Sequence, residues 1–123
     1  MGRSVMVPGD AIATVYVHVE IEDPLAWDDF VDNLRDEISA RYPTMKTVKR
    51  WAGRETAVIL ESEWGCVAVC EYCGLVSINL VPKPGNRRAF KVRDAWHRFV
   101  SKRWGGMTSL GFASNGEQFF VRN

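Results

Sequence analysis

The feature that most constrains this chain is a series of three short apolar segments, at residues 56–61, 66–72 and 75–81. Each has the length and the valine- and isoleucine-rich composition of a β-strand. The connections, Glu63-Trp64-Gly65 and Cys73-Gly74, are short enough to be hairpin turns. Residues 56–82 therefore predict a three-stranded antiparallel meander, which the Pro-Lys-Pro-Gly-Asn sequence at 82–86 ends.

Two segments outside the meander have the apolar spacing of amphipathic helices. The first opens at Asp23 and Pro24, which suit an N-cap and a first helical position, and it ends at Pro43. Its apolar stripe is Trp27, Phe30, Val31, Leu34, Ile38 and Tyr42. The second runs from Arg87 to Trp104, before Gly105-Gly106. Its apolar stripe is Ala89, Val92, Trp96, Phe99 and Val100.

Three more strands complete the expected architecture. Residues 11–21 alternate between apolar and polar side chains, and residues 109–113 and 118–122 flank an Asn-Gly turn within 114–117. For residues 45–54 the spacing of Met45, Val48 and Trp51 suggests a short helical turn. The predicted order is β-α-(short turn)-β-β-β-α-β-β. We expect an α+β fold with one mostly antiparallel sheet of about 5–6 strands and two amphipathic helices on one face. Residues 1–10 are expected to be a loose N-terminus, and 11–123 a single domain.

The composition indicates an ordinary globular chain of the cytoplasm. Of the 123 residues, 46% are apolar and 25% are charged, which excludes a disordered class. No apolar segment approaches the roughly 20 residues that span a bilayer, and the N-terminus lacks the pattern of a signal peptide. An odd number of cysteines, three, argues against a secreted fold held by disulfides.

Charge is distributed unevenly along the chain. Residues 1–42 carry nine acidic and three basic side chains, whereas the rest carry six acidic and thirteen basic ones. This asymmetry indicates either an electrostatic surface for a partner or attraction between the two regions within the fold. The acidic face of the first helix consists of Asp28, Asp29, Asp32, Asp36 and Glu37. The cations of the second helix are Arg87, Arg88, Lys91, Arg93, Arg98, Lys102 and Arg103.

Three interpretations of the basic helix stay open. Its cations could neutralise phosphates while Trp96 and Trp104 stack on bases, it could meet a protein partner, or it could be a plain solvated face. The cations scatter around the helix and do not form one stripe, which favours the last two. The acidic face of the first helix could likewise be a plain solvated surface.

The cysteines are the first candidates for chemistry. Cys66, Cys70 and Cys73 include a C-x-x-C pair, which suits zinc or redox chemistry in the right setting. However, no second pair completes a zinc ribbon, and strand alternation places Cys73 opposite the other two. Buried core cysteines are therefore the favoured interpretation, with no cofactor and no metal expected.

Other titratable groups give weak signals. Glu61 and Glu63, with Glu71 across the expected hairpin, and the pair Arg54-Glu55 could act as acid/base groups, but carboxylates at strand ends are common. The two histidines, His18 and His97, are expected on polar faces of different elements, without a third metal ligand. No catalytic motif is present, so an enzyme is less expected than a binding protein.

Four segments carry a resemblance to known proteins: WAGRE at 51–55, VILE at 58–61, EYCGLVS at 71–77 and LVP at 80–82. With these segments the chain resembles a group of small, uncharacterised proteins of bacteriophages and related mobile elements. The shared features extend from Trp27, Phe30 and Tyr42-Pro43 to the turn at 114–117. Cys66 and Cys70 are not part of the shared pattern. The resemblance implies no activity or cofactor, only a context in which small accessory proteins bind host machinery.

These observations predict a small, non-enzymatic binding protein of the cytoplasm, encoded by a phage and acting on a host protein. A nucleic-acid-binding module that uses the basic helix is the first alternative. A small enzyme or zinc protein centred on Cys66, Cys70 and Cys73 is the second. No membrane partner is expected, and the sequence leaves the oligomeric state open.

Overall fold

Seven strands and two helices make up the described part of the chain. In this computed structural model that part comprises residues 11–19, 23–105, 107–110 and 119–122. The elements in chain order are β1 (Ala13–His18), α1 (Pro24–Arg41), β2 (Lys46–Ala52), β3 (Thr56–Ser62), β4 (Gly65–Tyr72), β5 (Leu75–Pro82), α2 (Arg88–Trp104), β6 (Met107–Leu110) and β7 (Phe119–Arg122). The predicted loose N-terminus (1–10) and the Asn-Gly turn (114–117) lie outside the described residues.

All described strands belong to one sheet with the order β2-β3-β4-β5-β1-β6-β7. Every neighbouring pair is antiparallel. The first strand of the chain lies inside the sheet, where it pairs with β5 on one side and β6 on the other. The chain therefore crosses from β1 over the sheet through α1 and returns along the meander, so the expected α+β class is confirmed.

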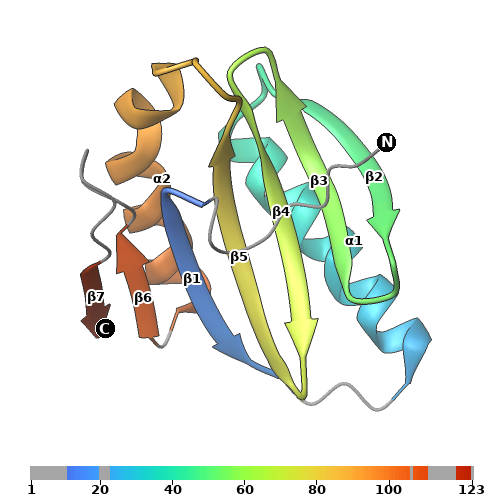
Figure 1. The fold of residues 1–123 in the computed structure, drawn as a ribbon. Coiled ribbons are helices and arrows are strands. Elements are labelled where there is room, and N and C mark those ends of the chain that lie inside the picture. The colour runs from blue at the N-terminus through green and yellow to red at the C-terminus, as the bar shows by residue number, and fades with distance from the viewer. Residues whose placement is uncertain (1–10, 20–22, 106, 111–118, 123) are drawn as a thin grey trace.

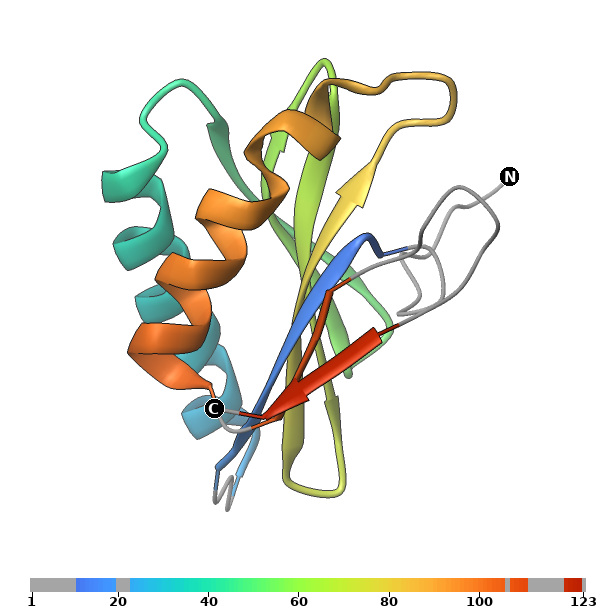
Figure 2. The ribbon, with the colours of Figure 1, turned by 90° about the vertical axis from the view of Figure 1, so that its left-hand side faces the viewer.

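Both helices pack on the same face of the sheet (Figures 1 and 2), as predicted. α1 begins where Asp23 caps it, since the Asp23 carboxylate accepts a hydrogen bond from the Ala26 N–H at 2.9 Å. α1 covers β2 and β3, whereas α2 covers β1, β5 and β6. The shared core contains the predicted stripe residues of both helices: Trp27, Val31, Leu34 and Ile38 from α1, and Ala89, Trp96 and Val100 from α2. Neither described helix is long and apolar enough to cross a membrane.

The short helical turn expected at 45–54 is wrong, because this segment contains the strand β2. β2 forms one edge of the sheet, and the meander therefore has four strands instead of three. Trp51 faces α1, where its ring meets Trp27, and Lys49, two residues earlier, faces α1 as well and pairs with Asp28. This is the period of a strand. The sequence does not show this strand pattern clearly, because a lysine occupies the side that faces the helix.

The hairpin predicted at Cys73-Gly74 is confirmed. Tyr72 and Leu75 are paired across it, and both turn residues have positive φ, +50° at Cys73 and +83° at Gly74. Two successive positive φ values are the signature of a two-residue turn that follows the twist of a β-hairpin. The turn also contacts the end of β1, because the Val19 N–H donates to the Gly74 carbonyl at 2.9 Å.

The strands β1, β4 and β5 share a buried polar cluster at the centre of the sheet. Thr14 Oγ1 donates to Asn79 Oδ1 at 2.8 Å, and Asn79 Nδ2 lies 3.2 Å from the Ala68 carbonyl and 3.1 Å from Ser77 Oγ. Thr14 and Asn79 are both almost fully buried. Because burial of an unpaired amide is costly, these mutual hydrogen bonds fix the register of β1 against β5.

Candidate partner-binding cleft

An open cleft of about 700 Å³ lies at the end of the molecule where α1 begins. This end also carries the β2–β3 turn and the end of β4, which lie together at the lower end of the view in Figure 1. The cleft has two aromatic side chains, Trp27 and Trp51, and a rim of four carboxylates and one arginine. The rim residues are Asp23, Asp28, Glu55, Glu71 and Arg54.

Trp27 is the fixed side of the cleft. It is 7% exposed, and its indole N–H donates to the Arg54 carbonyl oxygen at 2.8 Å. Its ring is stacked with Phe30 at a centroid distance of 6.1 Å and meets Trp51 edge-on at 6.2 Å. These contacts hold the β2–β3 turn against the first turn of α1, so the cleft is formed before any ligand enters it.

Trp51 is the accessible side of the cleft, with 41% of its surface exposed. Leu25 and Tyr72, which are 76% and 78% exposed, belong to the neighbouring first turn of α1 and end of β4. Three of the four exposed large hydrophobic side chains in the described part of the chain therefore gather at this end; the other is Phe90 on α2. Clustered exposed aromatic residues are typical of binding surfaces.

The carboxylates around the cleft are oriented by local contacts. Asp23 is the N-cap of α1, and Glu71 Oε2 accepts a hydrogen bond from the Gly74 N–H at 2.8 Å. The Glu55 carboxylate lies over Gly53, whose φ of +75° favours glycine. Four carboxylates against Arg54 make this region strongly negative, which favours a cationic ligand.

Lys49 sits at the side of the cleft and compensates part of this charge. Its ammonium lies 2.5 Å from Asp28 Oδ1, 2.8 Å from Asp32 Oδ1 and 5.7 Å from the centroid of the Trp51 ring. The hydrogen bonds to Asp28 and then to Asp32 raise the pKa of Lys49. The protein thus already places one cation against the aromatic and acidic groups that line the cleft.

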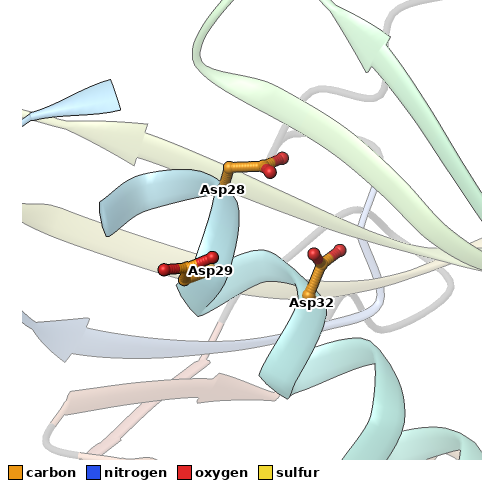
Figure 3. Close-up of side chains that lie close together, drawn as sticks. All are labelled: Asp28, Asp29 and Asp32. Atoms are coloured by element: carbon orange, nitrogen blue, oxygen red, sulfur yellow. The ribbon is translucent and has the colours of Figure 1, made fainter. Parts of the chain in front are cut away.

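The predicted acidic face of α1 is largely paired within the fold. Asp28, Asp29 and Asp32 bring carboxylate oxygens within 4.8 Å of one another, and Figure 3 shows the carboxylates of Asp28 and Asp32 extending from the same side of α1. Lys49 supplies the charge that a metal ion would supply there. Glu37 forms two hydrogen bonds of 2.9 Å with Arg103 of α2, and Asp36 pairs with Arg35. Attraction between the acidic and basic regions is therefore part of the fold.

The seven cations predicted for the second helix fall into three groups. Arg93 pairs with Asp94, and Arg103 pairs with Glu37, whereas Arg87 is the N-cap residue and lies over the Phe90 ring. The remaining four, Arg88, Lys91, Arg98 and Lys102, are exposed. Trp96 is fully buried beneath the helix, as its place in the apolar stripe predicts, so it is not accessible for the base stacking that one of the open interpretations assigned to it.

The expectation of three buried core cysteines is wrong, because Cys66 and Cys70 are only half-buried and Cys73 is exposed. Cys66 and Cys70 alternate with the core residues Val67 and Val69 on β4, and Cys73 lies in the turn. Burial raises the pKa of the Cys66 thiol to about 11, and Cys70 lies 3.5 Å from the Thr56 hydroxyl. Among the described residues, the three aspartates of α1 are the only metal-capable group, so the thiols do not converge on a common point.

The remaining titratable candidates are dispersed. Glu61 pairs with Arg50 at 2.6 Å, which lowers the pKa of Glu61, and Glu63 is exposed in the β3–β4 turn. His18 is exposed on β1, as expected, but the polar position expected for His97 is wrong. His97 is 7% exposed, and burial lowers its pKa.

Of the sequence candidates, the structure brings Arg54, Glu55, Glu71 and Asp28 together at one cleft. The sequence does not reveal the part played by Trp27 and Trp51, because the spacing around Trp51 suggests a helical turn instead of a strand. Comparison with known proteins found no matching family model, no similar curated protein and no similar solved structure.

Proposed function

We propose that this chain is a non-enzymatic protein-binding domain that receives a basic segment of its partner in the acidic aromatic cleft. One observation carries the proposal: the half-exposed ring of Trp51 lies beside four carboxylates, at the end of the molecule where Leu25 and Tyr72 are also exposed. An arginine or lysine side chain combines an apolar stem with a cationic head, and this cleft offers complementary groups to both.

Within the protein, Lys49 already makes the kind of contact that we propose for the partner. Its ammonium is 5.7 Å from the Trp51 centroid and contacts two carboxylates, which is the geometry proposed for a side chain of the partner. Such a cation–π contact contributes about 0.5–2 kcal/mol, and a hydrogen bond to a charged group about 1.5–3 kcal/mol. One cation–π contact at Trp51 together with two hydrogen bonds to carboxylates would give a specific, moderate affinity.

The resemblance to small phage proteins gives the proposal a context. A phage accessory protein of this kind would bind a host protein, and a basic loop or tail of that protein would enter the cleft. The cleft suits this role because the contact between Trp27 and Arg54 holds it in shape, which limits the entropic cost of binding.

The experiment is a calorimetric titration with a short peptide of alternating arginine and serine, and with the same peptide carrying glutamate in place of arginine. We expect binding of the arginine peptide alone, weakening as salt screens the carboxylates. Trp51→Ser should reduce the affinity about tenfold through loss of the cation–π contact and apolar surface. Phe90→Ser is the matched control, since Phe90 is exposed to a similar degree (38%) on α2, away from the cleft, and should leave the affinity unchanged.

Glu55→Gln with Glu71→Gln tests the electrostatic part. The amide introduced by Glu71→Gln keeps an oxygen that can accept from the Gly74 N–H, so the hairpin should persist while two charges disappear. Partly exposed pairs contribute up to about 1 kcal/mol each, so the affinity should fall several-fold. Equal binding of both peptides, or unchanged binding by Trp51→Ser, would refute the proposed site.

A further inference from the structure

Four cations on α2, Arg88, Lys91, Arg98 and Lys102, form a surface that the proposed cleft does not use; we call it the basic stripe. All four are exposed, and none forms an ion pair among the residues that the structure describes. The other two cations within the helix, Arg93 and Arg103, are each paired with a carboxylate. Pairing thus divides the cations of α2 into compensated and uncompensated groups.

The uncompensated cations share one side of the helix. At about 100° per residue, Lys91, Arg98 and Lys102 fall within about 40° of one another, and Arg88 extends the sector to about 80°. The buried residues Ala89, Trp96 and Val100 occupy the opposite side, against the sheet. The scatter expected for the full set of cations comes from Arg93 and Arg103, which lie outside this sector and are paired with carboxylates. From Arg88 to Lys102 the stripe spans about 21 Å at a rise of about 1.5 Å per residue.

The surroundings of the basic stripe add positive charge. α2 lies beside α1 in the helical layer (Figure 2), and Arg41 in the last turn of α1 places its guanidinium over the rings of Tyr42 and Phe99. Burial raises the pKa of Tyr42, and the positive charges of Arg41 and of Arg98 on α2 act to lower it. The one acidic residue of α2 is Asp94, and Arg93 compensates it.

We propose that the basic stripe binds the sugar–phosphate backbone of double-stranded nucleic acid without reading the bases. The charge is complementary, and a length of about 21 Å corresponds to about six steps of about 3.4 Å along one strand of a duplex. The exposed side chains of the stripe are lysines and arginines, which suit point contacts with phosphates. The stripe has no aromatic residue for stacking on unpaired bases, since Trp96 is buried and Phe90 already lies beneath Arg87.

Salt dependence is the quantitative expectation. Four phosphate contacts give a slope of about −3.6 for the logarithm of affinity against the logarithm of salt concentration. Affinity should therefore fall about 100-fold between about 50 and 200 mM salt. Replacement of two stripe cations should halve the slope to about −1.8.

The test measures fluorescence anisotropy of a labelled random-sequence duplex of about 20 base pairs, two helical turns. Lys91→Gln with Arg98→Gln should weaken binding at about 50 mM salt more than tenfold and halve the slope. Arg93→Gln with Arg103→Gln removes the same charge from the same helix but outside the stripe, and should keep most of the affinity and the slope. Circular dichroism checks that both variants remain folded.

Several outcomes would overturn the proposal: no duplex binding at low salt, equal loss in the two double variants, or tighter binding of a single strand of the same length. Binding to phosphatidylserine vesicles without binding to the duplex would assign the stripe to a membrane surface instead. Trp51→Ser should bind the duplex normally, so failure of the cleft and failure of the stripe are distinguishable.

Discussion

Replacement of Trp27 by phenylalanine tests whether the cleft is held in shape from within. The change removes the indole N–H that donates to the Arg54 carbonyl, and it shortens the ring that meets Phe30 and Trp51. The hydrogen bond contributes about 1 kcal/mol, because Arg54 is exposed and water can reach its carbonyl after the change. Loss of ring contacts adds about 1 kcal/mol.

The expected destabilisation is thus about 2 kcal/mol, which corresponds to a decrease in Tm of about 8 °C for a chain of this size. Urea unfolding followed by circular dichroism gives the free energy of unfolding directly. Trp51→Phe is the matched control, because the same chemical change at a half-exposed ring should cost less than about 1 kcal/mol. If Trp27→Phe were no more destabilising than the control, Trp27 would not anchor the β2–β3 turn.

Three further predictions concern groups outside the cleft. Burial lowers the pKa of His97, so the unfolded chain binds more protons than the folded chain below about pH 6.5. The free energy of unfolding should therefore fall as the pH decreases through that value, and His97→Gln should reduce this dependence. Urea titrations at about pH 7.5 and about pH 5 measure both effects. Asn79→Ala should cost about 2–3 kcal/mol in urea unfolding because it leaves the buried Thr14 hydroxyl unpaired, whereas the apolar pair Asn79→Leu with Thr14→Val should recover part of the loss. In thiol titration with a disulfide reagent at about pH 8, the exposed Cys73 should react first. Cys66 should react far more slowly, since with a pKa of about 11 only about one Cys66 thiol in a thousand is ionised; fast reaction of native Cys66 would contradict its burial.

Local signals explain how much of the fold the sequence predicts. Asp23 and Pro24 fix the start of α1, Gly105 follows the last residue of α2, and Cys73-Gly74 marks the β4–β5 turn. Each of these features acts within a few residues, so spacing and turn chemistry suffice. The placement of both helices on one face follows from their single apolar stripes.

The strand β2 and the cleft were not predictable in the same way. β2 is an edge strand that carries Lys46, Lys49 and Arg50, and charged edges are common because they prevent aggregation. The sequence does not show which side of β2 faces α1, because that side carries Lys49. Only the ion pair between Lys49 and Asp28 explains a lysine at that position. The cleft also needs Glu71, which reaches it through the pairing of β3 with β4.

The basic stripe is not evident in the sequence for a different reason. Arg93 and Arg103 make the cations of α2 look dispersed in the sequence, and only their ion pairs with Asp94 and Glu37 remove them from the free set. The Glu37–Arg103 pair joins residues of two different helices, so it depends on the packing of α1 beside α2. The local spacing of residues in the sequence does not predict that contact.

The most direct test of the acidic aromatic cleft is an NMR titration of the labelled protein with the alternating arginine–serine peptide. We expect the largest shifts at the indole N–H groups of Trp27 and Trp51 and at the backbone amides of Gly53, Glu55 and Glu71, which line the cleft. The amides of Arg98 and Lys102 on α2 should not move. Shifts confined to α2, or none at the two indoles at saturating peptide, would contradict binding in the cleft.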